Sequence, residues 1–426
     1  MGLALRAALA ALSPSLAPRQ GRAWDDALRR IRLACARAVW LAAASTAAAQ
    51  PAPEASQPAA GPSASAASAA LVGKGPASAS RPPRQWIAVP RVFGRLEAAD
   101  LGLVINTADP YSVEVGEYYI RARRLQPQQV LRVSLPLGPA ADGAPARPKS
   151  VLSREEFDEL ARRVGAHFGP RTQALALAWS RPYAVECNAI TGALTLGFDA
   201  ALCKRTGGPP SRASRYFNSP STRPYTDLRI RPSMLLAARD VAAAKALIDR
   251  GVASDGTLGQ GDGPPVNVHF VTTRDAVRSQ RELLFPPAGR VAAYGLDVRL
   301  DRTDALVDAE RVLMYLTGAA RVDRIETVRF VPGALADHLT SWGGSLDQPH
   351  GQMTVLSWID VGATASYGTV SEPYSHLQKF PHPQVLLMHY VQGASAIEAY
   401  WKSVAWPQQG LFVGEPLAAP FAPPGS

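Results

Sequence analysis

The chain has 426 residues, of which 47% are hydrophobic and 19% charged, enough apolar sequence for one large domain or two ordinary ones and too much for a chain that is disordered throughout. Its formal charge of +10 falls to +5 when residues 1–49 are set aside, because that segment holds seven Arg and two Asp. No basic run is interleaved with aromatic residues, so a nucleic-acid partner is not expected.

Residues 1–49 have the pattern of an export signal. Arg29, Arg30 and Arg32 precede the apolar stretch "LACARAVWLAAAS", and the small residues of "TAAAQ" allow cleavage after Ala49. The apolar stretch is short and interrupted by Arg37, so we expect no transmembrane span once the signal is removed. The sequence therefore predicts an exported protein, periplasmic or extracellular.

Residues 50–84 are dominated by Ala, Pro, Ser and Gly, a composition that cannot bury enough apolar surface to fold, and we interpret them as a disordered linker. Residues 85–426 are expected to form a single domain. After cleavage two cysteines remain, Cys187 and Cys203. In an oxidising compartment this pair favours a disulfide, and a catalytic thiol is the alternative.

Short apolar runs alternate with amphipathic segments along this domain. In chain order the pattern predicts strands at 101–107, 130–135, 173–180, 233–238, 267–273, 311–316, 327–331 and 363–369. It predicts helices at 113–124, 153–168 and 241–250, one that ends at 281, one that begins at 334, one at 353–360, and two on either side of Gly393. Continuous apolar strands between helices are typical of a parallel sheet covered on both faces. We expect an α/β fold, a three-layer sandwich with a mostly parallel sheet.

Ligands of such sheets bind beyond the carboxyl ends of the strands, which directs attention to the residues that follow each strand. Polar residues in these positions that are candidates for ligand binding are Asp109, Arg181, Tyr183 and Thr369. The alternative is that they only form turns, because every strand must turn before a helix.

The segment "YFNSPSTRPYTD" (216–227) is a long polar loop. Its Arg223 could bind a carboxylate or phosphate, with Asn218 and Ser219 as hydrogen-bonding partners; a structural clip over the sheet is the alternative. In "PGALADHLTSWGG" (332–344) the Pro-Gly pair predicts the start of a helix, at which Gly333 could bind an anion.

Side chains capable of catalysis gather late in the sequence. The candidates are Asp337, His338, Ser366, Ser371, Glu372 and His376. Asp337 and His338 are neighbours on the predicted helix and point about 100 degrees apart, so they do not form a triad with Ser341, and a structural role is favoured for His338. The histidine spacings match no compact metal site, so neither a metal nor another cofactor is predicted.

Several phrases resemble an uncharacterised family of exported bacterial proteins. They are "LGLVINTADPYSVEVGEYYIRAR", "NSPSTRPYTDL", "LADHLTSWGG", "GATASYGTVSEPYSHLQKFPHP" and "IEAYWKSVAWPQQGLFVGEPLAAP". A fainter resemblance, carried by "GATASYG" and "VGEP", is to gingipain-like cysteine peptidases of the caspase fold. That resemblance implies a caspase-like sheet, but the positions of the catalytic His and Cys are occupied here by Thr317-Gly318 and Pro332-Gly333.

Three functions remain open from the sequence. The first is a ligand-binding or degenerate caspase-like domain with its site at the carboxyl edge of the sheet, and the second is a peptidase or esterase acting on envelope or extracellular substrates. The third is a structural or assembly protein of the cell envelope. The first two predict that Arg181, Arg223, Asp337, His338 and Glu372 meet in one cleft; the partner and the reaction are not predicted.

Overall fold

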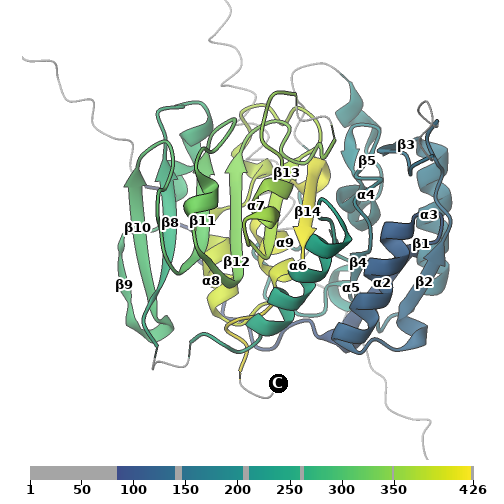
Figure 1. The fold of residues 1–426 in the computed structure, drawn as a ribbon, viewed down its shortest axis with the longest axis horizontal. Helices are drawn as coiled ribbons and strands as arrows, with labels where there is room; N and C mark the ends of the chain where they lie inside the picture. Colours follow the sequence, from purple (N-terminus) through teal and green to yellow (C-terminus); the bar gives the residue numbers. More distant parts are fainter. Residues whose placement is uncertain (1–83, 140–145, 205–210, 260–262, 348–349, 424–426) are drawn as a thin grey trace, which may run out of the picture. The chain divides into compact units, whose positions relative to one another are not determined.

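The computed structural model describes residues 84–139, 146–204, 211–259, 263–347 and 350–423. All of them belong to one compact unit, built on an eleven-stranded sheet with the order β2-β1-β4-β7-β14-β13-β12-β11-β8-β10-β9 (Figure 1). The predicted export signal lies outside the described residues, as does the linker except for Arg84.

Two groups of parallel strands make up most of this sheet. The first contains β2 (Val130–Val133), β1 (Leu101–Asn106), β4 (Ala174–Leu177) and β7 (Ser233–Leu235). The second contains β13 (Ala365–Thr369), β12 (Phe330–Leu339), β11 (Val312–Gly318), β8 (Val266–Thr272) and β10 (Leu296–Arg302). Between them lies β14 (Gly410–Gly414), antiparallel to β13, and β9 (Gly289–Val291) is antiparallel to β10. A small separate sheet contains β3 (Val151–Leu152), β5 (Ala184–Val185) and β6 (Asn188–Ala189).

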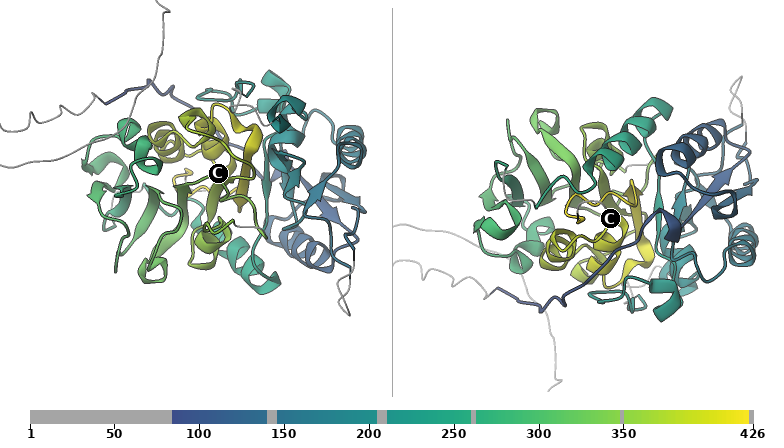
Figure 2. Two further views of the ribbon diagram at one scale, coloured as in Figure 1. Left: turned by 90° about the horizontal axis from the view of Figure 1, so that it is seen from above. Right: turned by 90° about the horizontal axis from the view of Figure 1, so that it is seen from below.

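Helices cover both faces of the large sheet, which confirms the predicted three-layer α/β fold (Figures 1 and 2). One face carries α2 (Pro110–Arg123), α6 (Val241–Ser254) and α7 (Leu356–Asp360). The other carries α3 (Arg154–His167), α4 (Ile190–Leu196), α8 (Pro383–Val391) and α9 (Ala396–Ser403). A short helix α5 (Pro224–Leu228) and a 3-10 segment η4 (Arg278–Leu284) complete the elements used below. The capping boxes Ser153/Glu156 and Ser395/Glu398 begin α3 and α9.

The predicted helix after residue 334 is wrong, because these residues continue β12 to Leu339. Gly333 does not begin a helix. It lies inside the strand with φ +84, its N–H donates to Thr364 Oγ1 at 2.9 Å, and its carbonyl accepts from Tyr390. A side chain there would meet Ser254 and Pro420 at 3.0 Å. The backbone groups that would have bound an anion are therefore already bonded within the fold.

Two further differences concern α6 and β10. Helix α6 does not end at Arg250 but runs through Gly251, where a Cβ would approach Glu415 Cγ to 2.5 Å, so glycine serves close packing rather than termination. Strand β10 was not predicted, although Leu296, Val298 and Leu300 alternate with polar residues.

Residues 84–97, which we call the N-terminal strap, run in extended conformation past α8 and α9 before they enter β1 (Figure 2, right). Side chains of the two helices hold its backbone: Gln384 Oε1 accepts from Ile87 N, Gln392 Oε1 from Val92 N, and Glu398 Oε2 from Leu96 N. Across the described ranges, no helix combines the length and the apolar character that a membrane span requires.

Candidate functional site

Residues that follow β4 meet residues that follow β12, so the carboxyl ends of these two strands lie at one edge of the sheet. Arg181 Nη2 is 3.0 Å from Asp347 Oδ2, and the Tyr183 hydroxyl donates to Asp347 Oδ1 at 2.5 Å. Ser150 also donates to this carboxylate. We call these four residues the clasp. Two of the predicted ligand-binding residues, Arg181 and Tyr183, are thus brought together at the expected edge.

The clasp is polar but already internally paired. Burial, and then the hydrogen bond to Asp347, raise the pKa of Tyr183 to about 12, so the phenol keeps its proton. Asp109, a third predicted residue on this side of the sheet, accepts from Tyr111 N and caps α2, and burial raises the pKa of its carboxyl group. These contacts stabilise the edge and leave few polar groups of the clasp for a ligand.

A hollow of about 220 Å³ lies farther along the same edge, beyond β12 and β13; we call it the edge hollow. Its apolar lining comes from Val277, Leu339, Pro373, Tyr374, Leu377 and Phe380, and its polar lining from Arg278, Gln280, Thr340, Ser341, Glu372, Ser375 and His376. Two of the predicted catalytic residues, Glu372 and His376, therefore line one hollow. Apolar walls with a few polar groups are typical of small-ligand sites.

Hydrogen bonds between separate elements hold the walls of the edge hollow. Arg278 Nε donates to Thr340 Oγ1 at 3.2 Å, while Arg278 Nη1 pairs with Asp275 at 2.7 Å. Thr340 in turn donates to Gln352 Oε1 at 2.6 Å. Thr369, predicted to bind a ligand, is fully buried and donates to the carbonyls of Thr340 and Ser341. It therefore acts by fixing the turn that forms one wall.

The loop after β13 forms the opposite wall. Glu372 Oε1 accepts from Tyr374 N at 2.9 Å. Beneath it Lys379 is 1% exposed, and its Nζ has no hydrogen-bond partner within the described parts of the chain. Burial lowers the pKa of Lys379 to about 8, an effect that the charge of Glu372 partly offsets. A carboxylate in the wall therefore lies near a buried amine that is poorly stabilised in its charged form.

Ser371 has no geometry of an activated nucleophile. Its hydroxyl donates to the Cys187 carbonyl at 2.6 Å and accepts from Gln409 Nε2 at 2.7 Å. Ser366 is completely buried in β13. A nucleophilic serine must give its proton to a base, and the Ser371 proton is instead directed to a backbone carbonyl.

Asp337 and His338 lie near the carboxyl end of β12, both 1% exposed. Asp337 is 2.6 Å from Arg281 Nη2 in the core. His338 Nε2 donates to the Met353 carbonyl at 2.9 Å, and His338 Nδ1 accepts from Trp358 Nε1 at 2.9 Å. These two bonds require the neutral ring, and burial lowers its pKa to about 4. The favoured structural role of His338 agrees with this environment.

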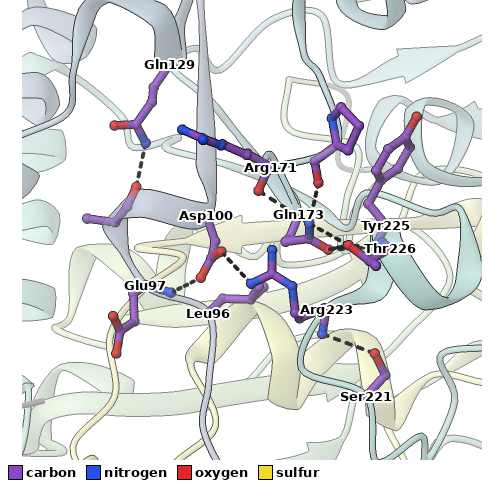
Figure 3. Close-up of polar contacts among 12 residues, drawn as sticks. Leu96, Glu97, Asp100, Gln129, Arg171, Gln173, Ser221, Arg223, Tyr225 and Thr226 are labelled. Carbon is purple, nitrogen blue, oxygen red and sulfur yellow. Dashed lines mark hydrogen bonds and ion pairs between the residues drawn. The ribbon is translucent and has the colours of Figure 1, made fainter. Parts of the chain in front are cut away.

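The loop 216–227 is a clip, one of the two roles considered for it. Arg223 Nη1 is 3.3 Å from Asp100 Oδ1, and Gln173 Oε1 accepts from the backbone N–H groups of Tyr225 and Thr226 (Figure 3). Asp100 directly precedes β1, so Arg223 lies at the amino end of that strand, away from the edge hollow.

The other two polar residues of the loop also make contacts within the fold. Asn218 Nδ2 donates to the Ala88 carbonyl of the strap at 2.8 Å, and Asn218 Oδ1 is 3.2 Å from His389 Nε2. Ser219 Oγ accepts from Ser221 N at 3.1 Å. The loop thus holds the strap against the domain.

Cys187 and Cys203 form the predicted disulfide, with an S–S distance of 2.01 Å. Because Ser371 bonds to the Cys187 carbonyl, this bridge supports the loop that leads to Glu372. No group of three or more His, Cys, Asp or Glu side chains that could hold a metal ion occurs in the ranges that the structure describes.

The expected meeting of five residues in one cleft does not occur. Arg181 belongs to the clasp, Arg223 to the clip, Asp337 and His338 to the core, and Glu372 to the edge hollow. The residues of the hollow that the sequence did not single out include Arg278 and Tyr374. Both follow predicted strands in the sequence, and this was the one sequence feature that could have indicated them.

A second hollow, of about 350 Å³, lies on the other side of η4 and shares Gln280 with the edge hollow. It is lined by Arg84, Thr272, Thr273, Ala276, Ser279, Glu282, Leu283 and Arg302 as well. Thr272 ends β8 and Arg302 ends β10, so this hollow also lies beyond carboxyl ends of strands. Comparisons of the chain with protein-family models, with curated proteins and with solved structures found no match.

Proposed function

We propose that this chain is an exported ligand-binding protein whose site is the edge hollow, and not the five-residue cleft expected from the sequence, since of those five residues only Glu372 lines the hollow. The observation that carries the proposal is the lining of the hollow at the carboxyl edge of the sheet, which combines apolar residues such as Leu339 and Phe380 with the charged residues Arg278 and Glu372. The disulfide is compatible with export.

The size of the hollow favours one residue of a longer molecule as the occupant. At about 220 Å³ it is smaller than the ~300–1,000 Å³ typical of sites that enclose a whole small ligand. A neighbouring hollow across η4 shares Gln280, so an extended chain that fills one could continue into the other. Apolar walls with charges of both signs suit a peptide, and we propose a peptide segment with an apolar residue next to a basic one.

We further propose that the domain is caspase-like but lacks cysteine-peptidase chemistry. The strand that the resemblance assigns to the nucleophile ends at Leu339 rather than at Val331, so the residues at that position are Thr340 and Ser341. Neither is a cysteine, and β11 ends in Thr317-Gly318 without a histidine.

Selection from a random peptide library displayed on phage, with the purified chain immobilised, tests the binding proposal. Ser341 is half-buried in the wall, and Ser341→Phe should fill the hollow and abolish binding of the selected peptides. Glu372→Gln should weaken binding of basic peptides about ten-fold, the loss of one charged contact. The matched control Glu326→Gln, an exposed carboxylate on a distant loop, should bind as the unmodified chain does. Enrichment of no peptide, or binding that Ser341→Phe leaves intact, would contradict the proposal.

A serine hydrolase is the second candidate, because Ser341, Glu372 and His376 line the same hollow. A fluorophosphonate probe distinguishes the two functions. The binding proposal predicts no labelling, whereas labelling that disappears in Ser341→Ala would identify a nucleophile and favour hydrolysis.

A further inference from the structure

The N-terminal strap places its largest apolar side chains in solvent. Trp86 is 67% exposed and Phe93 82% exposed, whereas Val92 is 7% exposed and Leu96 1%. Buried or half-buried residues are therefore interspersed with exposed ones along the strap, and Val92 and Leu96 already pack on the domain. Burial of large aromatic side chains contributes much of the stability of interfaces, so two of them exposed on one short segment make it a candidate contact surface.

From Arg84 to Leu96 the strap carries positive charge, and its one carboxylate is that of Glu97, the last residue, which is exposed. The segment from Arg84 to Leu96 holds three arginines and no Asp or Glu, and α8, on which it lies, has no acidic residue either. Arg84 and Arg91 are exposed, and Arg91 forms no ion pair with any residue that the structure describes. Arg95 differs, because it pairs with Glu97 at 3.5 Å and is mostly buried.

Side-chain hydrogen bonds from the domain hold the backbone of the strap in place. Gln384 and Gln392, two turns apart on α8, bind Ile87 N and Val92 N, and Asn218 binds the Ala88 carbonyl. Met388 lies between the two glutamines on that helix and is 37% exposed. Phe93 lies seven residues after Trp86, so the two are at most roughly 25 Å apart along the strap.

We propose that the strap and the outer face of α8 dock on the surface of an anionic phospholipid bilayer. Trp and Phe side chains favour the interface between headgroups and acyl chains, while arginines bind lipid phosphates. Trp86, Phe93 and Met388 would enter the interface, and Arg84 and Arg91 would lie at the level of the phosphates. Two aromatic residues and two arginines give reversible peripheral binding, not insertion.

Sedimentation of the full chain with vesicles tests this surface. We expect binding to vesicles of phosphatidylglycerol and phosphatidylcholine (3:7), weaker binding to phosphatidylcholine alone, and a decrease as salt is raised. Trp86→Ala/Phe93→Ala should reduce partitioning on the order of ten-fold, in line with the loss of apolar burial. Arg84→Gln/Arg91→Gln should reduce it about five-fold for each arginine at low salt.

Matched controls distinguish vesicle binding by the strap from binding by other exposed residues. The apolar segment within residues 1–49 is present in every variant, so its contribution to binding is the same in all of them. Val291→Ala/Val307→Ala removes exposed apolar residues elsewhere, and Arg321→Gln/Arg329→Gln removes exposed arginines elsewhere; both should partition as the unmodified chain does. Equal partitioning of the strap variants and their controls would overturn the proposal. So would equally tight binding to dextran sulfate that does not depend on Trp86 and Phe93, because it would identify a soluble anionic polymer as the partner. None of these residues except Arg84 lines a hollow, so failure here leaves the peptide site untouched.

Discussion

Tyr183 and Asp347 are joined by a hydrogen bond of 2.5 Å between two loops that leave different strands of the sheet. One loop follows β4 in the first group of parallel strands, and the other follows β12 in the second group. The bond and the ion pair of Asp347 with Arg181 therefore connect the two groups at their carboxyl edge, outside the sheet itself.

Removal of this carboxylate should loosen the connection. Asp347→Ala should lower the free energy of unfolding by about 2 kcal/mol, because Tyr183 and Ser150 lose a charged acceptor and Arg181 loses its counter-charge. Urea unfolding followed by tryptophan fluorescence measures the change. Asp323→Ala, on an exposed loop, is the control and should have little effect. A loss no larger than that of the control would show that the clasp adds nothing to stability.

Lys379→Met should stabilise the protein at pH 7. The buried Nζ has no hydrogen-bond partner within the described parts of the chain, so folding removes the hydration of its charge without replacing it. A methionine side chain has no charge to desolvate and avoids this cost. A gain of about 1 kcal/mol is expected in thermal unfolding. Because the folded pKa is about 8 and the unfolded pKa about 10.5, the native chain releases this proton first as pH rises, and wild-type stability should rise across that window. The advantage of the variant should therefore shrink between pH 8 and 10.

Lys245→Met is the matched control for this prediction. Lys245 lies on the surface of α6 and pairs with Glu114 at 2.6 Å, so its removal should leave stability unchanged or slightly lower. A Lys379→Met protein less stable than the unmodified chain would show that the amine has a partner that stabilises its charge.

His338 should make the fold sensitive to mild acid. The unfolded chain binds a proton at this ring near pH 6.5, whereas the folded chain does so only near pH 4, so the stability that it contributes is lost as pH falls between these values. His382 and His389, whose pKa values burial lowers to about 4 and about 3, act in the same direction. Urea midpoints at intervals of half a pH unit measure the slope. His338→Asn should be less stable at pH 7 and should have a slope shallower by up to about 1.4 kcal/mol per pH unit; an unchanged slope would exclude a buried neutral ring.

Loss of the disulfide should lower the free energy of unfolding by about 3 kcal/mol. The cysteines are sixteen residues apart, and without the bridge the unfolded chain gains the conformational entropy of a loop of this length. Cys187→Ser/Cys203→Ser should melt at a lower temperature than the oxidised chain. Dithiothreitol should lower the melting temperature of the unmodified chain to that of the variant and leave the variant unchanged. A reductant that affects both equally would point to another cause.

The class of fold was predictable from the sequence, whereas one long strand was not. Runs such as "NVHFVTT" and "RVLMYL" are apolar throughout and flanked by helix signals, which is enough to place β8 and β11. Strand β12 is also buried on both faces, so it shows no alternation, and its Ala and Leu residues favour helix equally well. Only the pairing with β11 and β13 decides between the two, and that pairing depends on residues remote in the chain.

The candidate site was predictable as an edge but not as a set of residues. Glu372 and His376 follow a predicted strand and do line the hollow, because the carboxyl ends of parallel strands meet there. Asp337 was expected on a helix, but it lies in β12, where the sheet and its covering helices bury it. Trp86 and Arg91 were not singled out because their exposure follows from how Gln384 and Gln392 hold the strap.

Among the described residues β14 is the last strand in chain order, yet it occupies the middle of the sheet, between β7 and β13. A polypeptide that emerges amino-terminus first must therefore hold two unpaired strand edges apart until Gly410–Gly414 arrives. Until then each group of strands presents an open edge of the kind that recruits other chains. We therefore expect the nascent chain to be prone to aggregation in the interval between synthesis of β13 and of β14.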